Sequence, residues 1–416
     1  MVASSAGRCR TVLALLALLA LGDVRPLELQ AFWPPPQNLS VTPGRSTFPL
    51  IVSASAGGDL WVVWTEYTDD PRGEVWGRRR IGACHQWEEA QNLSASAQRD
   101  EGPALLADRA GSVHLAWTRR SPNQGSDILY RRWDGANWSA EERLNHTDVY
   151  HPAPYGLQFL YDVSGRLCLY ASQGSGTSHA CQENGAWGTW TPWIYLPGVR
   201  RIGGLLLGPD GLFHGAVFGP NAGGYFGCDP WLDDAYYITT DGQSWSTPVN
   251  LSGVGSIAYD AMLAFDAQGG LHFLWSDLSP LCSYDSERSA VYERVLNGGV
   301  WGPREEVSVP NEGQAVEDLA LVADPSGRLH LAWSEGVFTP GGAAVDLGIR
   351  YRRWQGGRWL PEEVVYGSAE DSLNVEMDVG PRGEPVLVWE EGPATAEEVL
   401  FSERVARLVF LPLVRR

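Results

Sequence analysis

The heptapeptide GSVHLAW, from Gly111 to Trp117, decides the fold because it recurs along the chain. A glycine followed six residues later by tryptophan also occurs in GDLWVVW (Gly58 to Trp64), GGLHFLW (Gly269 to Trp275), GRLHLAW (Gly327 to Trp333) and GEPVLVW (Gly383 to Trp389). Degenerate copies begin at Gly165 and Gly211. The period of roughly 54 residues lies in the range of β-propeller blades.

Each of these heptapeptides lies within a longer repeating unit, which is clearest from Pro103 to Leu144. The runs ALLAD, VHLAW, ILYRRW and WSAEERL alternate with turn residues, and this is the pattern of strands rather than helices. The sequence therefore predicts one four-stranded antiparallel sheet per unit, and an all-β chain. Because the tryptophans recur at equivalent positions, we interpret them as packing between units rather than as a ligand surface.

The fourth strand has its own mark, a tryptophan with Leu or Val six residues later. It occurs at Trp87, Trp138, Trp190, Trp245, Trp301 and Trp359, and once more before the first unit, in WPPPQNLS from Trp33 to Ser40. The last unit, after Trp389, lacks it. We therefore predict a seven-bladed β-propeller in which the N-terminal strand completes the last blade. An open stack of sheets is the alternative, but it would need distinct capping repeats and no such latch.

Composition narrows the possible partners. The formal net charge is −19 and all 31 basic residues are arginine, so lysine-based Schiff-base and phosphate-loop chemistry is excluded. An acidic surface repels nucleic acid and anionic lipid, which leaves neutral sugars, cations or proteins as expected partners.

The N-terminus has the layout of a secretory signal: Arg8 and Arg10 precede an apolar run from Thr11 to Leu21 that is too short to span a bilayer. We expect a cleaved signal peptide over residues 1–22, a propeller over 33–405, a short C-terminal tail over 406–416, and a secreted protein without a membrane span. The tail sequence LVFLPLVRR is interpreted as a frayed end, with a sorting or anchoring signal as the alternative.

Export would permit disulfides. We predict the pairs Cys168 with Cys181, in one hairpin, and Cys228 with Cys282, in equivalent loops of successive repeats. Cys84 is then left over, free or buried. Five unpaired cysteines are the open alternative.

The turn before the fourth strand reads WDGANW from Trp133 to Trp138 and TTDGQSW from Thr239 to Trp245. These turns resemble the Asp-box (BNR repeat) of the sialidase superfamily, with one residue fewer between aspartate and glycine. Asp134 and Asp241 would stabilise the turn through side-chain to backbone hydrogen bonds.

The resemblance covers roughly residues 33 to 405 and implies carbohydrate as the ligand class. It also implies three arginines that hold a carboxylate, an acid/base aspartate and a tyrosine activated by a glutamate. The family's first arginine belongs to an Arg-Ile-Pro motif, and the nearest segment here, STFP from Ser46 to Pro49, lacks it. Sialidases normally have six blades, against the seven counted here.

Loops that enter the first strand of each blade form one rim of the channel, where ligands usually bind. The residues at these positions are polar. The ligand-binding candidates are Arg45, Arg99, Asp100, Glu101, Tyr150, His151, Arg200, Arg201, Tyr259, Asp260, Glu317, Asp318, Glu370 and Asp371. They either bind a polar ligand or are solvated loop charges.

No cofactor or metal is predicted, since HExxH, paired CxxC and GxSxG are absent and the acidic loop CDPWLDD (Cys228 to Asp234) lacks calcium-ligand spacing. The leading hypothesis is a secreted sialidase-like propeller that binds glycan or another polar ligand at the rim. The alternatives are an exo-glycosidase, whose carboxyl pair would lie within ~5 to 10 Å, and a structural or protein-interaction ring. Catalytic residues are not assigned.

Overall fold

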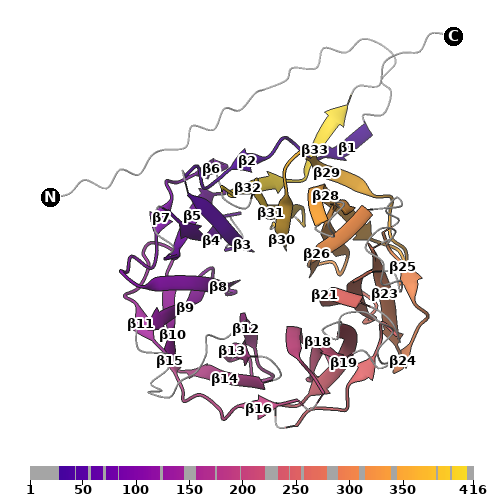
Figure 1. The fold of residues 1–416 in the computed structure, drawn as a ribbon, viewed down its shortest axis with the longest axis horizontal. Coiled ribbons are helices and arrows are strands. Elements are labelled where there is room, and N and C mark those ends of the chain that lie inside the picture. Colours follow the sequence, from indigo (N-terminus) through magenta and orange to yellow (C-terminus); the bar gives the residue numbers. More distant parts are fainter. Residues whose placement is uncertain are drawn as a thin grey trace, which may run out of the picture.

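The protein is a closed ring of seven antiparallel sheets around a central channel (Figure 1). The computed structural model describes residues 28–409, apart from 43, 55–57, 69–71, 83, 122–124, 145–155, 174–175, 197, 221–232, 243, 254–256, 279–288, 309–313, 339–343, 381–382 and 394–395. No helix in these ranges is long and apolar enough to cross a bilayer. The prediction of an all-β, seven-bladed propeller is confirmed.

Each blade runs outward from the channel in chain order, and blades 1 to 6 follow one another along the sequence. Their strands are, for blade 1, β3 (Arg45–Ser53), β4 (Leu60–Tyr67), β5 (Glu74–Ile81), β6 (Gln86–Trp87) and β7 (Gln91–Asn92); for blade 2, β8 (Arg99–Ala107), β9 (Val113–Ser121), β10 (Gly125–Trp133) and β11 (Glu142–Arg143); and for blade 3, β12 (Gly156–Tyr161), β13 (Leu167–Gln173), β14 (Gly176–Glu183), β15 (Ala186–Trp187) and β16 (Ile194–Tyr195).

Blades 4 to 6 repeat this order. Their strands are, for blade 4, β17 (Arg201–Leu207), β18 (Phe213–Pro220), β19 (Asp233–Thr240) and β20 (Val249–Asn250); for blade 5, β21 (Ile257–Phe265), β22 (Leu271–Leu278), β23 (Ser289–Asn297), β24 (Val300–Trp301) and β25 (Glu305–Glu306); and for blade 6, β26 (Gln314–Ala323), β27 (Leu329–Phe338), β28 (Ala344–Trp354) and β29 (Glu363–Gly367).

Blade 7 joins the two ends of the chain. It consists of β30 (Ser372–Val379), β31 (Pro385–Glu391), β32 (Glu398–Glu403) and, as its outer strand, β2 (Gln37–Asn38). Gln37 lies opposite Phe401 and Asn38 opposite Leu400, so the predicted latch is confirmed. Closure removes the open edges that a linear stack would expose.

A second pairing of the two ends was not predicted. Strands β1 (Glu28–Phe32) and β33 (Val405–Val409) form an antiparallel ribbon that extends away from the ring (Figure 1). Between the ribbon and the latch, Trp33 reaches blade 6, where its indole nitrogen donates to Glu363 at 3.1 Å and its ring meets Tyr351 edge-on. The chain ends are therefore held at several successive points.

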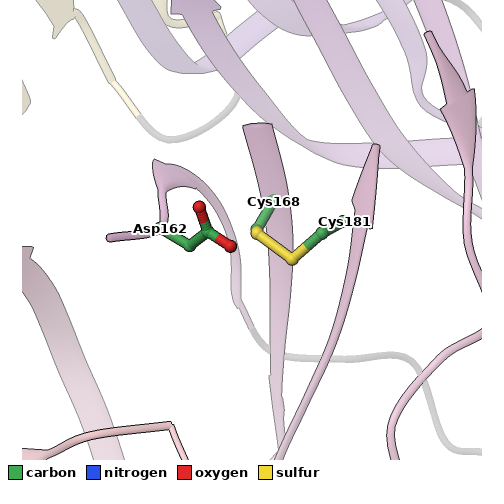
Figure 2. Close-up of side chains that lie close together, drawn as sticks. All are labelled: Asp162, Cys168 and Cys181. Atoms are coloured by element: carbon green, nitrogen blue, oxygen red, sulfur yellow. A yellow bond between two sulfur atoms is a disulfide. The ribbon is translucent and has the colours of Figure 1, made fainter. Parts of the chain in front are cut away.

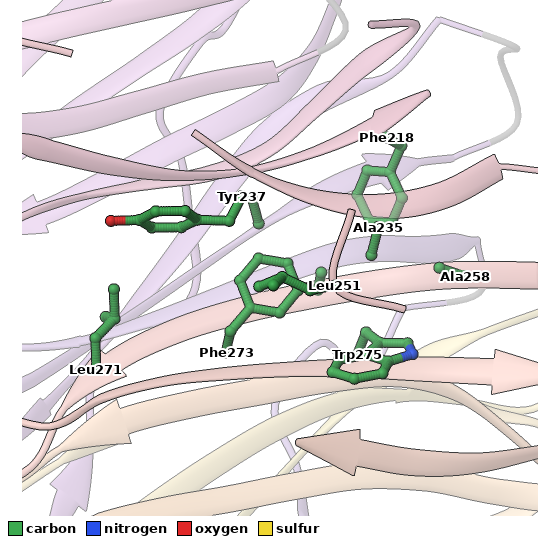
Figure 3. Packing of buried hydrophobic residues seen from close by; sticks show 10 residues of the cluster. Phe218, Ala235, Tyr237, Leu251, Ala258, Leu271, Phe273 and Trp275 are labelled. Carbon is green, nitrogen blue, oxygen red and sulfur yellow. The ribbon is translucent and has the colours of Figure 1, made fainter. Parts of the chain in front are cut away.

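The core lies between blades rather than at the centre of the ring. Figure 3 shows one such layer, in which Phe218, Tyr237 and Leu251 of blade 4 pack against Phe273 and Trp275 of blade 5. The tryptophans that end the heptapeptides are fully buried: Trp64, Trp117, Trp275, Trp333 and Trp389. Their interpretation as packing residues is confirmed.

Candidate functional site

The first strands line the channel, and most of them are interrupted at the same level. The pairing register of the first strand with the second shifts by one residue in β3, β8, β17, β21, β26 and β30, as in a β-bulge. In β3 the shift falls between Thr47 and Leu50, and in β26 between Val316 and Leu319. A bulge bends its strand and re-aims side chains, so these positions point differently from the regular ladder.

A cavity of about 460 Å³ opens at this level of the channel, and we call it the channel cavity. Blades 1, 2, 3, 5, 6 and 7 all contribute to its lining. Phe48, Leu50, Leu157 and Met262 supply apolar surface. The polar residues of the lining are Glu101, Thr118, Arg120, Asp260, Asp318, Asn374 and Glu376.

Carboxyl groups from blades 5, 6 and 7 dominate one side of the channel cavity. Burial raises the pKa of Asp260 to about 6, although its hydrogen bond from the Leu319 amide opposes the rise. Burial also raises the pKa of Glu376 to about 8, and the neighbouring charges of Asp260 and Asp318 add to this effect. The pKa of Asp318 rises through burial as well. Carboxyls crowded together out of water favour the neutral form.

The carboxyl of Glu376 differs from its neighbours in its hydrogen bonds. Asp260 accepts from the Leu319 amide at 3.1 Å, and Asp318 accepts from the Asn374 amide at 2.6 Å, so each bridges to the next blade. Within the described residues, no hydrogen bond ties down the carboxyl of Glu376. It is a protonatable group that lines a cavity and remains available to a ligand.

Arg120 and Glu101 lie on the blade 2 side of the channel cavity. The Arg120 guanidinium donates to Glu101 at 2.7 Å, and Arg99 donates to the same carboxylate at 2.7 Å. Arg120 is the one arginine in the described lining, and it is already paired. Nothing in this lining matches the three-arginine carboxylate clamp that the sialidase resemblance implied.

The structure brings three of the sequence-derived candidates, Glu101, Asp260 and Asp318, into the channel cavity. Glu317 lies beside them on the β26 bulge, and burial raises its pKa to about 7, with Asp318 and Asp371 adding to the rise. Glu370 is exposed outside the cavity. Tyr150, His151 and the side chain of Tyr259 lie outside the described residues. The ligand-binding role of all these candidates stays a prediction.

The other candidates make contacts within the protein. Arg45 pairs with Glu397 at 2.9 Å, Arg200 with Asp233 at 3.0 Å, and the Arg201 guanidinium lies 3.4 Å from the centre of the Phe218 ring. Asp100 is completely buried, and it accepts from Trp117 at 2.8 Å and from Arg119 at 2.7 Å. These contacts give each side chain a structural role.

Asp134 and Asp241 stabilise their turns. One carboxylate oxygen of Asp134 accepts from the amides of Ala136 and Asn137, both at 2.8 Å. Asp241 accepts from the Ser244 amide at 2.9 Å. The hydrogen bonds expected from the sequence are present.

A repeated buried histidine was missed in the sequence analysis. His114, His214 and His330 each place Nδ1 on a tyrosine hydroxyl, at 2.8, 2.6 and 2.6 Å. Their Nε2 atoms lie 3.4, 3.1 and 3.5 Å from a carboxylate oxygen of Asp108, Asp210 and Asp324 in the preceding turn. The spacing D-x-x-G-x-x-H of Asp108 to His114 and of Asp324 to His330 could have revealed two of these sites, whereas Asp210 lies only four residues before His214.

In blade 3 a disulfide replaces this arrangement. Cys168 occupies the histidine position and bonds to Cys181, directly opposite on β14, so this predicted pair is confirmed (Figure 2). Asp162 lies beside the disulfide (Figure 2), but bonded cysteines cannot offer thiolates, so this group is no metal site. It is the one cluster of three potential ligands found in the described residues. Cys84 has no disulfide partner there, and Cys228 and Cys282 fall outside the described ranges.

A second cavity, of about 760 Å³, lies further along the channel, where β3, β8 and β30 end. Its lining is mostly apolar apart from Ser53, Asp108, Arg109 and Asp378. Burial raises the pKa of Asp378 to about 6, although the carboxylate accepts from the Ser53 amide at 2.6 Å. This bond also joins blades 7 and 1.

Comparison with known proteins shows the fold alone. No protein-family model matches the chain, and no curated protein matches it. Among solved structures, an ulvan lyase from a new family of polysaccharide lyases is 13% identical, with a TM-score of 0.55 over 90% of this chain and 98% of that one. A fungal alcohol oxidase in complex with copper is 12% identical, with a TM-score of 0.52 over 90% and 76%.

The NanB sialidase from Streptococcus pneumoniae is 10% identical, with a TM-score of 0.45 over 92% of this chain and 70% of that one. The sheet topology, independently of this match, shows the propeller fold that the resemblance to the sialidase superfamily implied. A lyase and an oxidase share this ring, so the architecture does not select a reaction.

Proposed function

We propose that this protein binds a neutral glycan or a similar polar ligand in the channel cavity. The observation that carries the proposal is the lining of that cavity, in which Asp260, Asp318 and Glu376 lie together with apolar side chains. Carboxyl and carboxylate groups bond sugar hydroxyls as donors and acceptors. Small-molecule sites are typically concave, with a few polar groups on a mostly apolar wall. The ulvan lyase, whose name connects it with a polysaccharide, adds weaker support from fold analogy.

The binding test compares two glutamates that lie in and outside the channel cavity. Glu376→Ala removes a carboxyl from the lining, whereas Glu370→Ala removes an exposed carboxylate near the start of the same strand. A glycan array identifies bound sugars, and titration calorimetry then compares the variants. We expect Glu376→Ala to weaken binding about tenfold or more, and Glu370→Ala to leave it unchanged. Equal affinity in wild type and Glu376→Ala would overturn the proposal.

A second candidate function, exo-glycosidase activity, is favoured by Glu376. A pKa of about 8 keeps this carboxyl protonated at neutral pH, beside Asp260 with a pKa of about 6. Two carboxyls with separated pKa values suit general acid and base roles. In this reaction Glu376 protonates the departing glycosidic oxygen, water attacks the anomeric carbon, and Asp260 or Asp318 takes the proton from that water.

Nitrophenyl glycosides of neutral sugars and of sialic acid test this activity between pH 5 and pH 8. Turnover that disappears in Glu376→Gln while binding persists would support the enzyme, because an amide cannot supply the proton. Binding without turnover in wild type would indicate a lectin-like protein that binds sugar without cleaving it. Neither binding nor turnover, with protein partners recovered by cross-linking, would favour the scaffold.

Export is part of the proposal. The Cys168–Cys181 disulfide supports it, since such bonds persist mainly in oxidising compartments. N-terminal sequencing of protein recovered from culture medium should begin near Gly22. Retention of the full chain inside the cell would contradict export.

A further inference from the structure

Phe48 stands in a conformation that bulky side chains rarely adopt. It lies within the β3 bulge with a φ of 53°, in the left-handed region that favours glycine. The corresponding bulge of blade 2 has Gly102, with a φ of 63°, at this place. Blade 1 therefore has phenylalanine in a backbone conformation that glycine would adopt at a lower energetic cost.

The Phe48 ring is not used for packing inside the protein. The residue is 49% exposed, and it belongs to none of the buried apolar clusters of the described chain. It lines the channel cavity that also contains Asp318 and Glu376. A large, rigid apolar surface is thus presented to the cavity rather than to the core.

Hydrogen bonds from blade 7 hold this backbone in place. The Phe48 amide donates to the carboxylate of Glu390 at 2.5 Å, and the side-chain amide of Asn374 donates to the same oxygen at 2.7 Å. Asn374 itself has a φ of 50° in the β30 bulge, and its backbone amide donates to Asp318. Two unusual backbone positions are therefore fixed by one network, and strain maintained in this way marks functional sites.

We propose that Phe48 is a stacking platform for the apolar C–H face of a neutral hexopyranose, whose hydroxyls then bond to Asp318 and Glu376. This inference rests on the proposed function and specifies its ligand class. An aromatic ring gives a flat apolar surface with little conformational freedom to lose, and a pyranose with equatorial hydroxyls offers a matching apolar face.

The charges of the channel cavity select against acidic sugars. Asp260, Asp318 and Glu376 contribute carboxyls, and the single arginine in the described lining already pairs with Glu101. A uronic or sialic acid would have to place its carboxylate near these three carboxyls, and the described lining offers no unpaired arginine to neutralise it. Neutral sugars should therefore bind and their acidic counterparts should not.

The test uses the full mature chain and the methyl glycosides of glucose, galactose, mannose and glucuronic acid, with affinity measured by titration calorimetry. Phe48→Gly removes the ring and relieves the backbone, while Phe48→Trp keeps an aromatic surface. Val41→Gly is the matched control, because Val41 also has a positive φ, of 48°, and is 70% exposed outside the cavity.

We expect Phe48→Gly to weaken binding of the neutral glycosides about tenfold, with a melting temperature equal to or above that of wild type. Phe48→Trp and Val41→Gly should bind within about threefold of wild type. Wild-type affinity in Phe48→Gly, while Glu376→Ala still loses binding, would overturn the platform and leave the proposed function intact. Tighter binding of the glucuronide than of the glucoside would overturn the ligand class. Unchanged affinity in both Phe48→Gly and Glu376→Ala would contradict the proposed function as well.

Discussion

The indole nitrogen of Trp117 donates to Asp100, a residue 17 positions earlier in the chain, at 2.8 Å. In blades 1, 5, 6 and 7 the corresponding acceptor instead lies two positions after the tryptophan: Glu66, Asp277, Glu335 and Glu391. In blade 2 that later position is Arg119, which bonds to Asp100. Each of these five tryptophans therefore donates to a carboxylate, which is buried in every case except the partly exposed Glu391, and the carboxylate is supplied from two different positions in the blade.

This relationship predicts that blade 2 can be converted to the arrangement of blade 1. Asp100→Ser alone should lower the free energy of unfolding by about 3 kcal/mol, because it removes a buried, charged hydrogen-bond partner. Asp100→Ser combined with Arg119→Glu recreates the Ser46–Glu66 pair, in which the hydroxyl donates to the glutamate at 2.8 Å. We expect the double variant to recover at least half of the loss in urea unfolding. Additive losses would contradict the equivalence.

The chain closure can be tested with three equivalent leucines. Leu39 of the N-terminal latch is as buried as Leu93 and Leu251, which follow the same Asn residue of other blades. Leu39→Ala should cost about 2 to 4 kcal/mol, as much as Leu93→Ala or Leu251→Ala, because each leaves a similar cavity. A much smaller effect of Leu39→Ala in chemical unfolding would show that the ends separate before the ring unfolds.

The titration of Glu376 should make the free energy of unfolding depend on pH. Its folded pKa of about 8 lies above its usual 4.5, so the native protein binds more protons than the unfolded chain between these values. Stability from this group is complete below pH 4.5 and is lost as the pH rises through about 8. Glu376→Gln replaces the titratable carboxyl with a neutral amide and leaves Asp260 and Asp318 unchanged.

Unfolding free energies of wild type and Glu376→Gln should therefore diverge with pH. We expect the variant to gain about 3 kcal/mol over wild type between pH 5 and pH 8. Glu370→Gln, at an exposed position, serves as the control and should show no such gain. A constant difference across this range would mean that Glu376 is already ionised.

The buried histidine motif should contribute through its tyrosine. The Tyr351 hydroxyl lies 2.6 Å from Nδ1 of His330, and burial lowers the pKa of His330 to about 4, so the ring is neutral and accepts this bond near pH 7. Tyr351→Phe should cost about 1 to 3 kcal/mol in thermal or urea unfolding, since it leaves a buried acceptor without a partner. Tyr366→Phe is the matched control, because its ring packs on Trp389 and no described hydrogen bond involves its hydroxyl. Equal costs for both variants would contradict this role.

The amino-acid sequence by itself determined the number of blades, their four strands and the closure by Trp33 to Leu39. These features depend on burial that repeats at a fixed period. Equivalent positions of each blade are buried in the same way, so they carry the same residue types in each copy of the repeat. It also gave the Cys168–Cys181 pair, because both residues lie within one hairpin.

Only the tertiary structure decided which rim residues reach the channel cavity. The bulges that turn Phe48, Asp318 and Asn374 toward it depend on how each first strand pairs with its neighbour, and the segments involved share no common motif. The raised pKa of Glu376 depends first on its burial and then on the charge of Asp260, which is distant in the chain but lines the same cavity. Burial and the proximity of other charges arise only when residues from several blades come together around the cavity, so they cannot be predicted from the local sequence around Glu376.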